Sequence, residues 1–208
     1  MSENSGTHAD TQPCLHYGLR GVLDVEVKLS GPKRNLHSGV DGGVIREPMM
    51  DLVAILSTLA SPECGTIKIA GIYDRVRPLT PEEVEMYENI KDFDRERYQS
   101  ALGVELPRSD TAAQLLIKRW RQPTLSIHSI SSGTPIKSSI IPASVSARVG
   151  LRLVPDQDSS EVYNALRAHI EQQVRVGLAA IERLIDRSIV ARALTVGGMM
   201  DAHNATRR

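Results

Sequence analysis

The chain has 208 residues, enough for one domain with its own core or for one domain that carries an insertion. Its 25 basic and 25 acidic residues cancel and aromatic side chains are scarce, which argues against binding to nucleic acid or anionic lipid. Cys14 and Cys64 show no metal or redox spacing, and no apolar run approaches the ~20 residues that span a membrane. We therefore expect a cytoplasmic protein without disulfide bonds.

The first half of the chain predicts a strand, a loop, a helix and a second strand. Residues 1–12 are polar, lack the apolar segment of a secretory signal and predict a disordered tail. Residues 21–30 alternate strictly between apolar and polar side chains, which is typical of a half-buried strand. The Gly- and Pro-rich segment 31–47 predicts a loop, and apolar side chains at helical spacing predict a helix over 48–59. Residues 65–71 predict a short second strand.

Residues 73–122 differ from their surroundings because they are rich in charge. Thr80 and Glu83 have the spacing of a capping box, with a proline between them at the first helical position. A second helix is predicted near residues 109–119. We interpret the segment as an insertion of short helices on the surface of the domain.

The second half predicts two further strands and a helix. Residues 124–130 and 144–155 predict strands, and the second of these alternates cleanly. Asp158 and Glu161 predict the start of a helix. From about residue 174 the pattern remains helical, up to a basic tail rich in Gly and Met.

This order of elements predicts an α+β fold. We expect a two-layer sandwich of a mostly antiparallel four-stranded sheet with two helices on one face, plus a helical insertion and a helical C-terminal extension. The other face of the sheet is expected to be open to solvent. It would carry the polar side chains of the alternating strands: Asp24, Glu26, Lys28, Arg148 and Arg152.

No complete catalytic site can be assembled from the residues alone. The chain lacks a phosphate-binding loop and a nucleophile elbow, and its six histidines are scattered without a metal-ligand motif. His37 in its loop is, taken alone, more often a turn or surface residue. Arg152 is more often solvated or ion-paired, and Ser139 more often caps a loop backbone group.

Five segments that occur in order carry a resemblance that changes this balance: PCLHYGLRG, KRNLHSGVDGG, REPM, RWRQPTLSIHSI and SSIIPASVSARVGLRLVPDQD. Together they resemble the lid, or dimerisation domain, of the zinc-dependent metallopeptidase family of carnosine dipeptidases, carboxypeptidase G-type enzymes and aminoacylases. The nearest branch contains the cytosolic nonspecific dipeptidases and the fungal enzymes of glutathione breakdown. The resemblance implies a ferredoxin-like lid over residues 13–173, interrupted by the insertion 73–122 and followed by the extension 174–208.

The resemblance also implies roles for the three residues. In the complete family enzyme, a separate catalytic domain binds two zinc ions and supplies a glutamate as general base, while two lids pair to form the dimer. His37 would reach the active site of the partner subunit and polarise the scissile carbonyl group. Ser139 would contact the substrate, and Arg152 would hold its C-terminal carboxylate.

The sequence departs from the family in two ways. No residues match the family's metal-binding motifs in their proper place, so we expect this chain to bind no cofactor and to be inactive alone, as a fragment or stand-alone lid. After residue 173 the family forms a further strand, whereas this pattern remains helical, so we expect the sheet to lack an edge strand.

The expected partners follow from this reading. We expect a homodimer, or a dimer with a full-length relative, a peptide substrate only in the complete enzyme, and neither nucleic acid nor membrane. The alternative is a non-catalytic dimerisation module that regulates a relative. An RNA-binding sandwich is a third hypothesis, which the charge balance and scarce aromatics disfavour.

Overall fold

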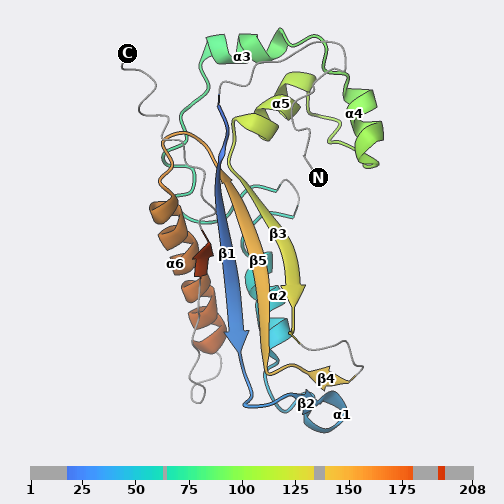
Figure 1. Cartoon of the computed structure of the whole chain (residues 1–208), viewed down its shortest axis with the longest axis vertical. Helices are drawn as coiled ribbons and strands as arrows, with labels where there is room; N and C mark the ends of the chain where they lie inside the picture. Colours follow the sequence, from blue (N-terminus) through green and yellow to red (C-terminus); the bar gives the residue numbers. More distant parts are fainter. Residues whose placement is uncertain (1–17, 63–64, 134–138, 180–191, 195–208) are drawn as a thin grey trace.

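The structure is a computed structural model that describes residues 18–62, 65–133, 139–179 and 192–194. Within them, a four-stranded antiparallel sheet has the order β3-β5-β1-β6, and β2 and β4 form a separate two-stranded sheet (Figure 1). The strands are β1 (Gly21–Ser30), β2 (Leu36–His37), β3 (Thr124–Ser131), β4 (Ile140–Ile141), β5 (Ser144–Leu153) and β6 (Arg192–Leu194). The helices are α1 (Ser38–Asp41), α2 (Pro48–Ser57), α3 (Pro81–Glu88), α4 (Arg95–Leu102), α5 (Ala112–Trp120) and α6 (Ser159–Ala179). The expected mixed fold with an antiparallel sheet is confirmed.

β1 and β5 form the centre of the sheet and pair over their full length, from Gly21 opposite Leu153 to Ser30 opposite Ser144. Their strict alternation places every second side chain on each face. The predicted inward-facing side chains are all buried: Leu23, Val25, Val27, Leu29, Val145, Ala147, Val149, Leu151 and Leu153. The polar side chains between them lie on the opposite face, which we call the open face.

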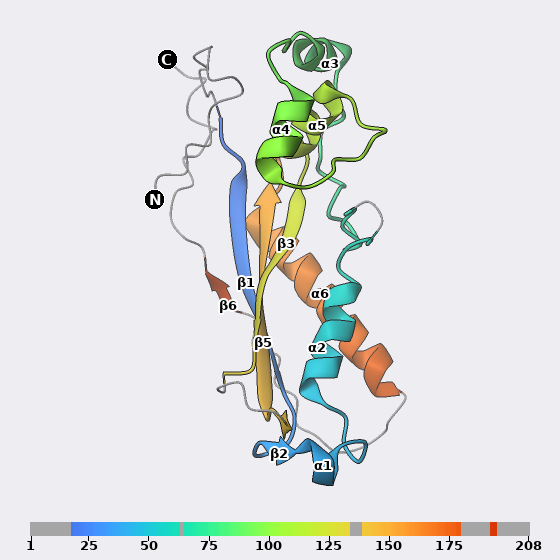
Figure 2. The ribbon, with the colours of Figure 1, turned by 90° about the vertical axis from the view of Figure 1, so that its right-hand side faces the viewer.

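α2 and α6 cover the apolar face of the sheet (Figure 2). α2 begins at Pro48, as predicted, and Arg46 forms an ion pair with the buried Asp51 in its first turn. α6 begins after Asp158, whose Oδ1 accepts a hydrogen bond from the backbone N–H of Glu161 at 3.0 Å. Each helix start thus has the cap or ion pair that its N-terminal residues favour.

One predicted strand is wrong. In segment 65–71, Ile67 forms only an isolated bridge with Ala60, so these residues do not join the main sheet. The fourth strand of the sheet is β6, which pairs with β1 over residues 24–26. The expectation that the sheet lacks this edge strand is therefore also wrong. Among the described residues, the two edge strands of the sheet are β6, with three residues, and β3, with eight.

The predicted C-terminal extension also differs from the structure. α6 continues through residue 173 to Ala179 without a break, and residues 192–194 form a strand rather than a helix. The remainder of the extension and the predicted tail 1–12 lie outside the described residues.

The segment 73–122 contains three helices that stand at one end of the sheet (Figure 1). The predicted capping box at α3 is confirmed, since Thr80 and Glu83 exchange hydrogen bonds of 3.1 and 3.2 Å. α5 agrees with the predicted second helix, while α4 was not predicted. Phe93, Leu116 and Ile117 are buried within this segment, which gives it a small core of its own.

Candidate functional site

The two-stranded sheet holds His37 and Ser139 at a tip beyond the end of the main sheet (Figure 1). His37 lies in β2, opposite Ile140 of β4. The backbone N–H of Ser38 donates to the carbonyl oxygen of Ser139 at 2.9 Å. The structure thus brings together two of the three residues predicted to contact a substrate.

The imidazole ring of His37 is exposed, and one hydrogen bond from the backbone orients it. The backbone N–H of Gly39 donates to Nδ1 of His37 at 3.0 Å. Since Nδ1 accepts a hydrogen bond, the proton of the neutral ring is on Nε2. His37 therefore presents an N–H donor to the solvent side of the tip.

The turn that follows His37 depends on close backbone approaches. A side chain at Gly42 would place its Cβ 2.2 Å from the carbonyl oxygen of Ser38, which no residue but glycine tolerates. On the facing strand, Ser139 has a φ of 74°, in the left-handed region that non-glycine residues rarely adopt. The tip thus requires glycine at position 42 and holds Ser139 in a locally unfavourable backbone conformation.

Arg152 lies at the opposite end of the sheet from this tip. It is exposed on the open face, opposite Thr124, whereas the tip adjoins the other end of β5, where the strand begins at Ser144. Eight residue steps (152 − 144) separate these positions, which is about 26 Å along a strand. An extended dipeptide spans only about 7 Å, so one substrate cannot touch His37 and Arg152 of the same domain.

The unpaired edge strand β3 carries two isoleucines that sequence reasoning did not single out. A register shift after Ile127 marks a β-bulge at His128. Because of this extra residue, Ile127 and Ile130 lie opposite Val149 and Ala147 and share their apolar face. They remain 45% and 46% exposed, since the sheet ends at β3. The bulge itself gave no signal in the sequence.

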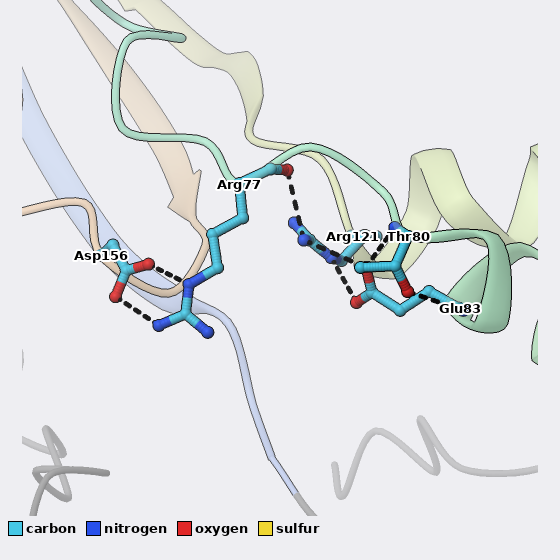
Figure 3. Close-up of polar contacts among 5 residues, drawn as sticks. All are labelled: Arg77, Thr80, Glu83, Arg121 and Asp156. Atoms are coloured by element: carbon cyan, nitrogen blue, oxygen red, sulfur yellow. Dashed lines mark hydrogen bonds and ion pairs between the residues drawn. The ribbon is translucent and has the colours of Figure 1, made fainter.

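The helical insertion is tied to the sheet by arginine side chains (Figure 3). Both oxygens of Asp156, which follows β5, accept from Arg77, with Nη2 at 2.8 Å from Oδ1. Arg121 donates from Nε to Glu83 at 3.0 Å and from Nη2 to the carbonyl oxygen of Arg77 at 3.2 Å. The hydrogen bonds from Arg121 and the Thr80 backbone lower the pKa of Glu83. These contacts fix both ends of the insertion beside the end of β5.

A zinc site does not fit the side chains of the described residues. No three or more of their His, Cys, Asp and Glu side chains lie close enough together to hold a metal ion. In the same part of the chain, no helix is both long enough and apolar enough to cross a lipid bilayer.

Comparison with known proteins agrees with this geometry. Residues 17–177 match the peptidase dimerisation domain of the M20 family. The chain is 43% identical to the Cys-Gly metallodipeptidase dug1 of Schizosaccharomyces pombe over 162 residues, or 76% of this chain and 33% of that protein. It is 41% identical to the Beta-Ala-His dipeptidase of Rattus norvegicus, over 77% of this chain and 32% of that protein.

Two solved structures of metallodipeptidases share the fold. The structure of the di-peptidase Dug1p from Saccharomyces cerevisiae has a TM-score of 0.78 at 33% identity, and covers 90% of this chain and 37% of that one. Human carnosine dipeptidase 1 also has a TM-score of 0.78, at 34% identity, and covers 87% and 37%. The chain spans about a third of the length of the curated relatives it matches. It therefore belongs to the M20 metallopeptidase family, in which residues 17–177 form the dimerisation domain.

Proposed function

We propose that this domain joins two subunits of a dipeptidase-type metallopeptidase by pairing the β3 edges of two lids. The observation that carries the proposal is the half-exposed pair Ile127 and Ile130 on β3, whose outer edge pairs with no other strand of the described residues. Antiparallel pairing of two β3 strands would satisfy the free backbone groups of both edges. It would also bring four isoleucine side chains together on the apolar face of a continuous sheet.

The proposed partner is a second copy of the chain, and the β3 edge of a full-length relative offers the same chemistry. A two-fold axis across β3 would direct the two tips away from each other, to opposite ends of the joined sheet. Each tip would then lie at the end of the joined sheet that carries the Arg152 of the other lid. This arrangement supports a role for His37 outside its own subunit.

We further propose that His37 and Ser139 contact a peptide substrate in the active site of the partner subunit. The exposed Nε2–H of His37 can donate to the oxygen of a scissile carbonyl and stabilise the negative charge that develops there. Ser139 would add a hydroxyl contact beside it. The metal, expected to be zinc, would be held by a separate catalytic domain and would activate the attacking water.

Arg152 is proposed to hold the C-terminal carboxylate of the substrate, as a planar guanidinium favours. Because it lies about 26 Å from the start of the tip, it would serve a different active site from the His37 of its own domain. Each active site would then combine the Arg152 of one lid with the His37 of the other. The cytoplasmic location and the lack of activity of the chain alone belong to the same proposal.

Subunit mixing tests this arrangement in a complete metallodipeptidase that carries this domain. One subunit would carry His37→Ala, and the other a disrupted metal site with His37 intact. Either subunit alone is expected to be inactive. Random re-pairing yields one working site in half of the dimers, which restores about a quarter of the wild-type activity. If the mixture remains inactive while the subunits demonstrably exchange, His37 does not act across the dimer.

A further inference from the structure

Two further arginines lie near the end of the sheet that carries Arg152, one before β1 and one in the helical insertion. Arg20 precedes β1, and its Nη1 donates to the carbonyl oxygen of Gln122 at 3.1 Å and lies 3.5 Å from Oγ1 of Thr124. β1 and β3 are separated by β5 in the sheet, so the side chain of Arg20 must cross over β5 to reach them. Arg152 is the residue of β5 that lies opposite Thr124, so the two guanidinium groups lie close together.

The third arginine comes from the helical insertion. Arg119 lies in the last turn of α5, three residues before Gln122, and its guanidinium carbon lies 5.5 Å from the ring centre of Tyr98. In this cation–π contact the guanidinium group lies over the face of the Tyr98 ring, so the contact orients the side chain without using its N–H donors. The ion pairs of the insertion hold α5 at this end of the sheet (Figure 3).

These three cations have no negative partner in the part of the chain that the structure describes. None of the ion pairs there includes Arg20, Arg119 or Arg152. Burial lowers the pKa of Arg20, and the charges of Arg152 and Arg119 lower it further. Partly buried like charges are unfavourable until an anion lies among them. Elsewhere on the open face the charges alternate, as where Arg148 faces Glu26.

We propose that Arg20, Arg119 and Arg152 form one binding site for a ligand end with two negative charges, such as a peptide whose C-terminal residue is aspartate or glutamate. The inference rests on the proposed role of Arg152 and extends it from one carboxylate to two. Arg152 would bind the α-carboxylate, while Arg20 and Arg119 bind the side-chain carboxylate. The charge of Arg20 interacts with those of both Arg152 and Arg119, so the three side chains form one cluster of a size that a small ligand with two carboxylates can contact.

Titration of the chain with two nearly isosteric dipeptides tests this inference. Gly-Asp and Gly-Asn differ by one charge, and their dissociation constants can be measured by NMR at low ionic strength. Gly-Asp is expected to bind about tenfold more tightly, as one or two additional charge-assisted hydrogen bonds would provide. Arg20→Gln and Arg119→Gln should each remove most of this preference. Arg20→Lys keeps the charge and should retain it, and so should Arg148→Gln on the same face of β5.

The outcomes separate this inference from the proposed function. Equal affinity for both peptides, or a preference that persists in Arg20→Gln and Arg119→Gln, would overturn it. If Arg152→Gln still abolishes Gly-Asn binding in that case, the single-carboxylate role of Arg152 stands. Failure of both peptides to bind would also overturn the inference. Unchanged core methyl spectra would establish that each variant is folded.

Discussion

Replacing Ile127 by lysine is expected to weaken the dimer by an amount that its exposure sets. The side chain is 45% exposed in the single chain. Full burial of an isoleucine contributes about 1.5–3 kcal/mol, so burial of the exposed fraction would contribute about 0.7–1.4 kcal/mol. A two-fold dimer contains the residue twice, so the loss is about 1.4–2.7 kcal/mol and the dimer Kd rises about 10- to 100-fold. Repulsion between the two lysines adds to this loss.

Sedimentation equilibrium across the micromolar range would measure this change. Val104→Lys is the matched control, because Val104 is 60% exposed but lies in the helical insertion, between α4 and α5 and outside the sheet. Its dimer Kd should equal that of the unmodified chain. An unchanged Kd in Ile127→Lys, or an equal loss in both variants, would refute the assignment of the interface to β3.

Three further predictions concern the tip, the core and the response to pH. Gly42→Ala should lower the free energy of unfolding by about 1–3 kcal/mol and shift the NMR signals of the His37 ring, because the new Cβ would overlap a backbone oxygen. Gly18→Ala is the control, since a Cβ at Gly18 meets nothing within 4 Å, and it should change neither property. Leu52→Ala should lower the free energy of unfolding in urea by about 2–5 kcal/mol, since Leu52 is fully buried beneath the sheet, and an unfolding curve like that of the unmodified chain would contradict this. Burial lowers the pKa of His169 below its unfolded value, so the folded state favours the neutral ring, whose Nε2 lies 2.9 Å from Oγ1 of Thr58. The contribution of His169 to the free energy of unfolding should be complete above its unfolded pKa of about 6.5 and should decline as the pH falls through the lower folded pKa. In thermal melts, the melting temperature of His169→Gln should therefore fall less in acid than that of the unmodified chain.

The central strands were predictable because the burial of their side chains follows a simple alternation in the sequence. Both β1 and β5 have one buried and one open face, and a period of two encodes that directly. Segment 65–71 has the same local alternation, and Ile67 and Ile69 are indeed buried. Gly65 and Gly71 adopt positive φ at its two ends and turn the chain, so only one bridge forms. Whether such a segment forms a strand or a buried turn depends on its pairing with distant residues, which local alternation does not encode.

The edge of the sheet was not predictable for a related reason. β6 is only three residues long, Arg192–Leu194, and its pairing with β1 spans more than 160 positions of the chain. Three residues carry no periodicity, so nothing local marks them as a strand. The exposed pair on β3 depends on a bulge at His128, and a single extra residue reverses the face that alternation assigns to Ile130.

The candidate site was partly predictable. The motifs named His37, Ser139 and Arg152, and resemblance alone supplied their roles. The proximity of His37 and Ser139 depends on β2 and β4, two strands of two residues each that no pattern could reveal, and on the hydrogen bond from the Ser38 N–H to the carbonyl oxygen of Ser139. The distance of Arg152 from the tip follows from the register of β5.

The distance between two copies of β3 tests the central claim most directly. A nitroxide on Ser129→Cys, with Cys14 and Cys64 replaced by serine, would lie on the open face of the edge strand, where it leaves the isoleucines undisturbed. Double electron–electron resonance should give one narrow distance for this label, shorter than the distance for a label on Val104→Cys in the helical insertion. Absence of dipolar coupling at dimer-forming concentrations, or a Ser129→Cys distance longer than that of Val104→Cys, would contradict dimerisation through β3.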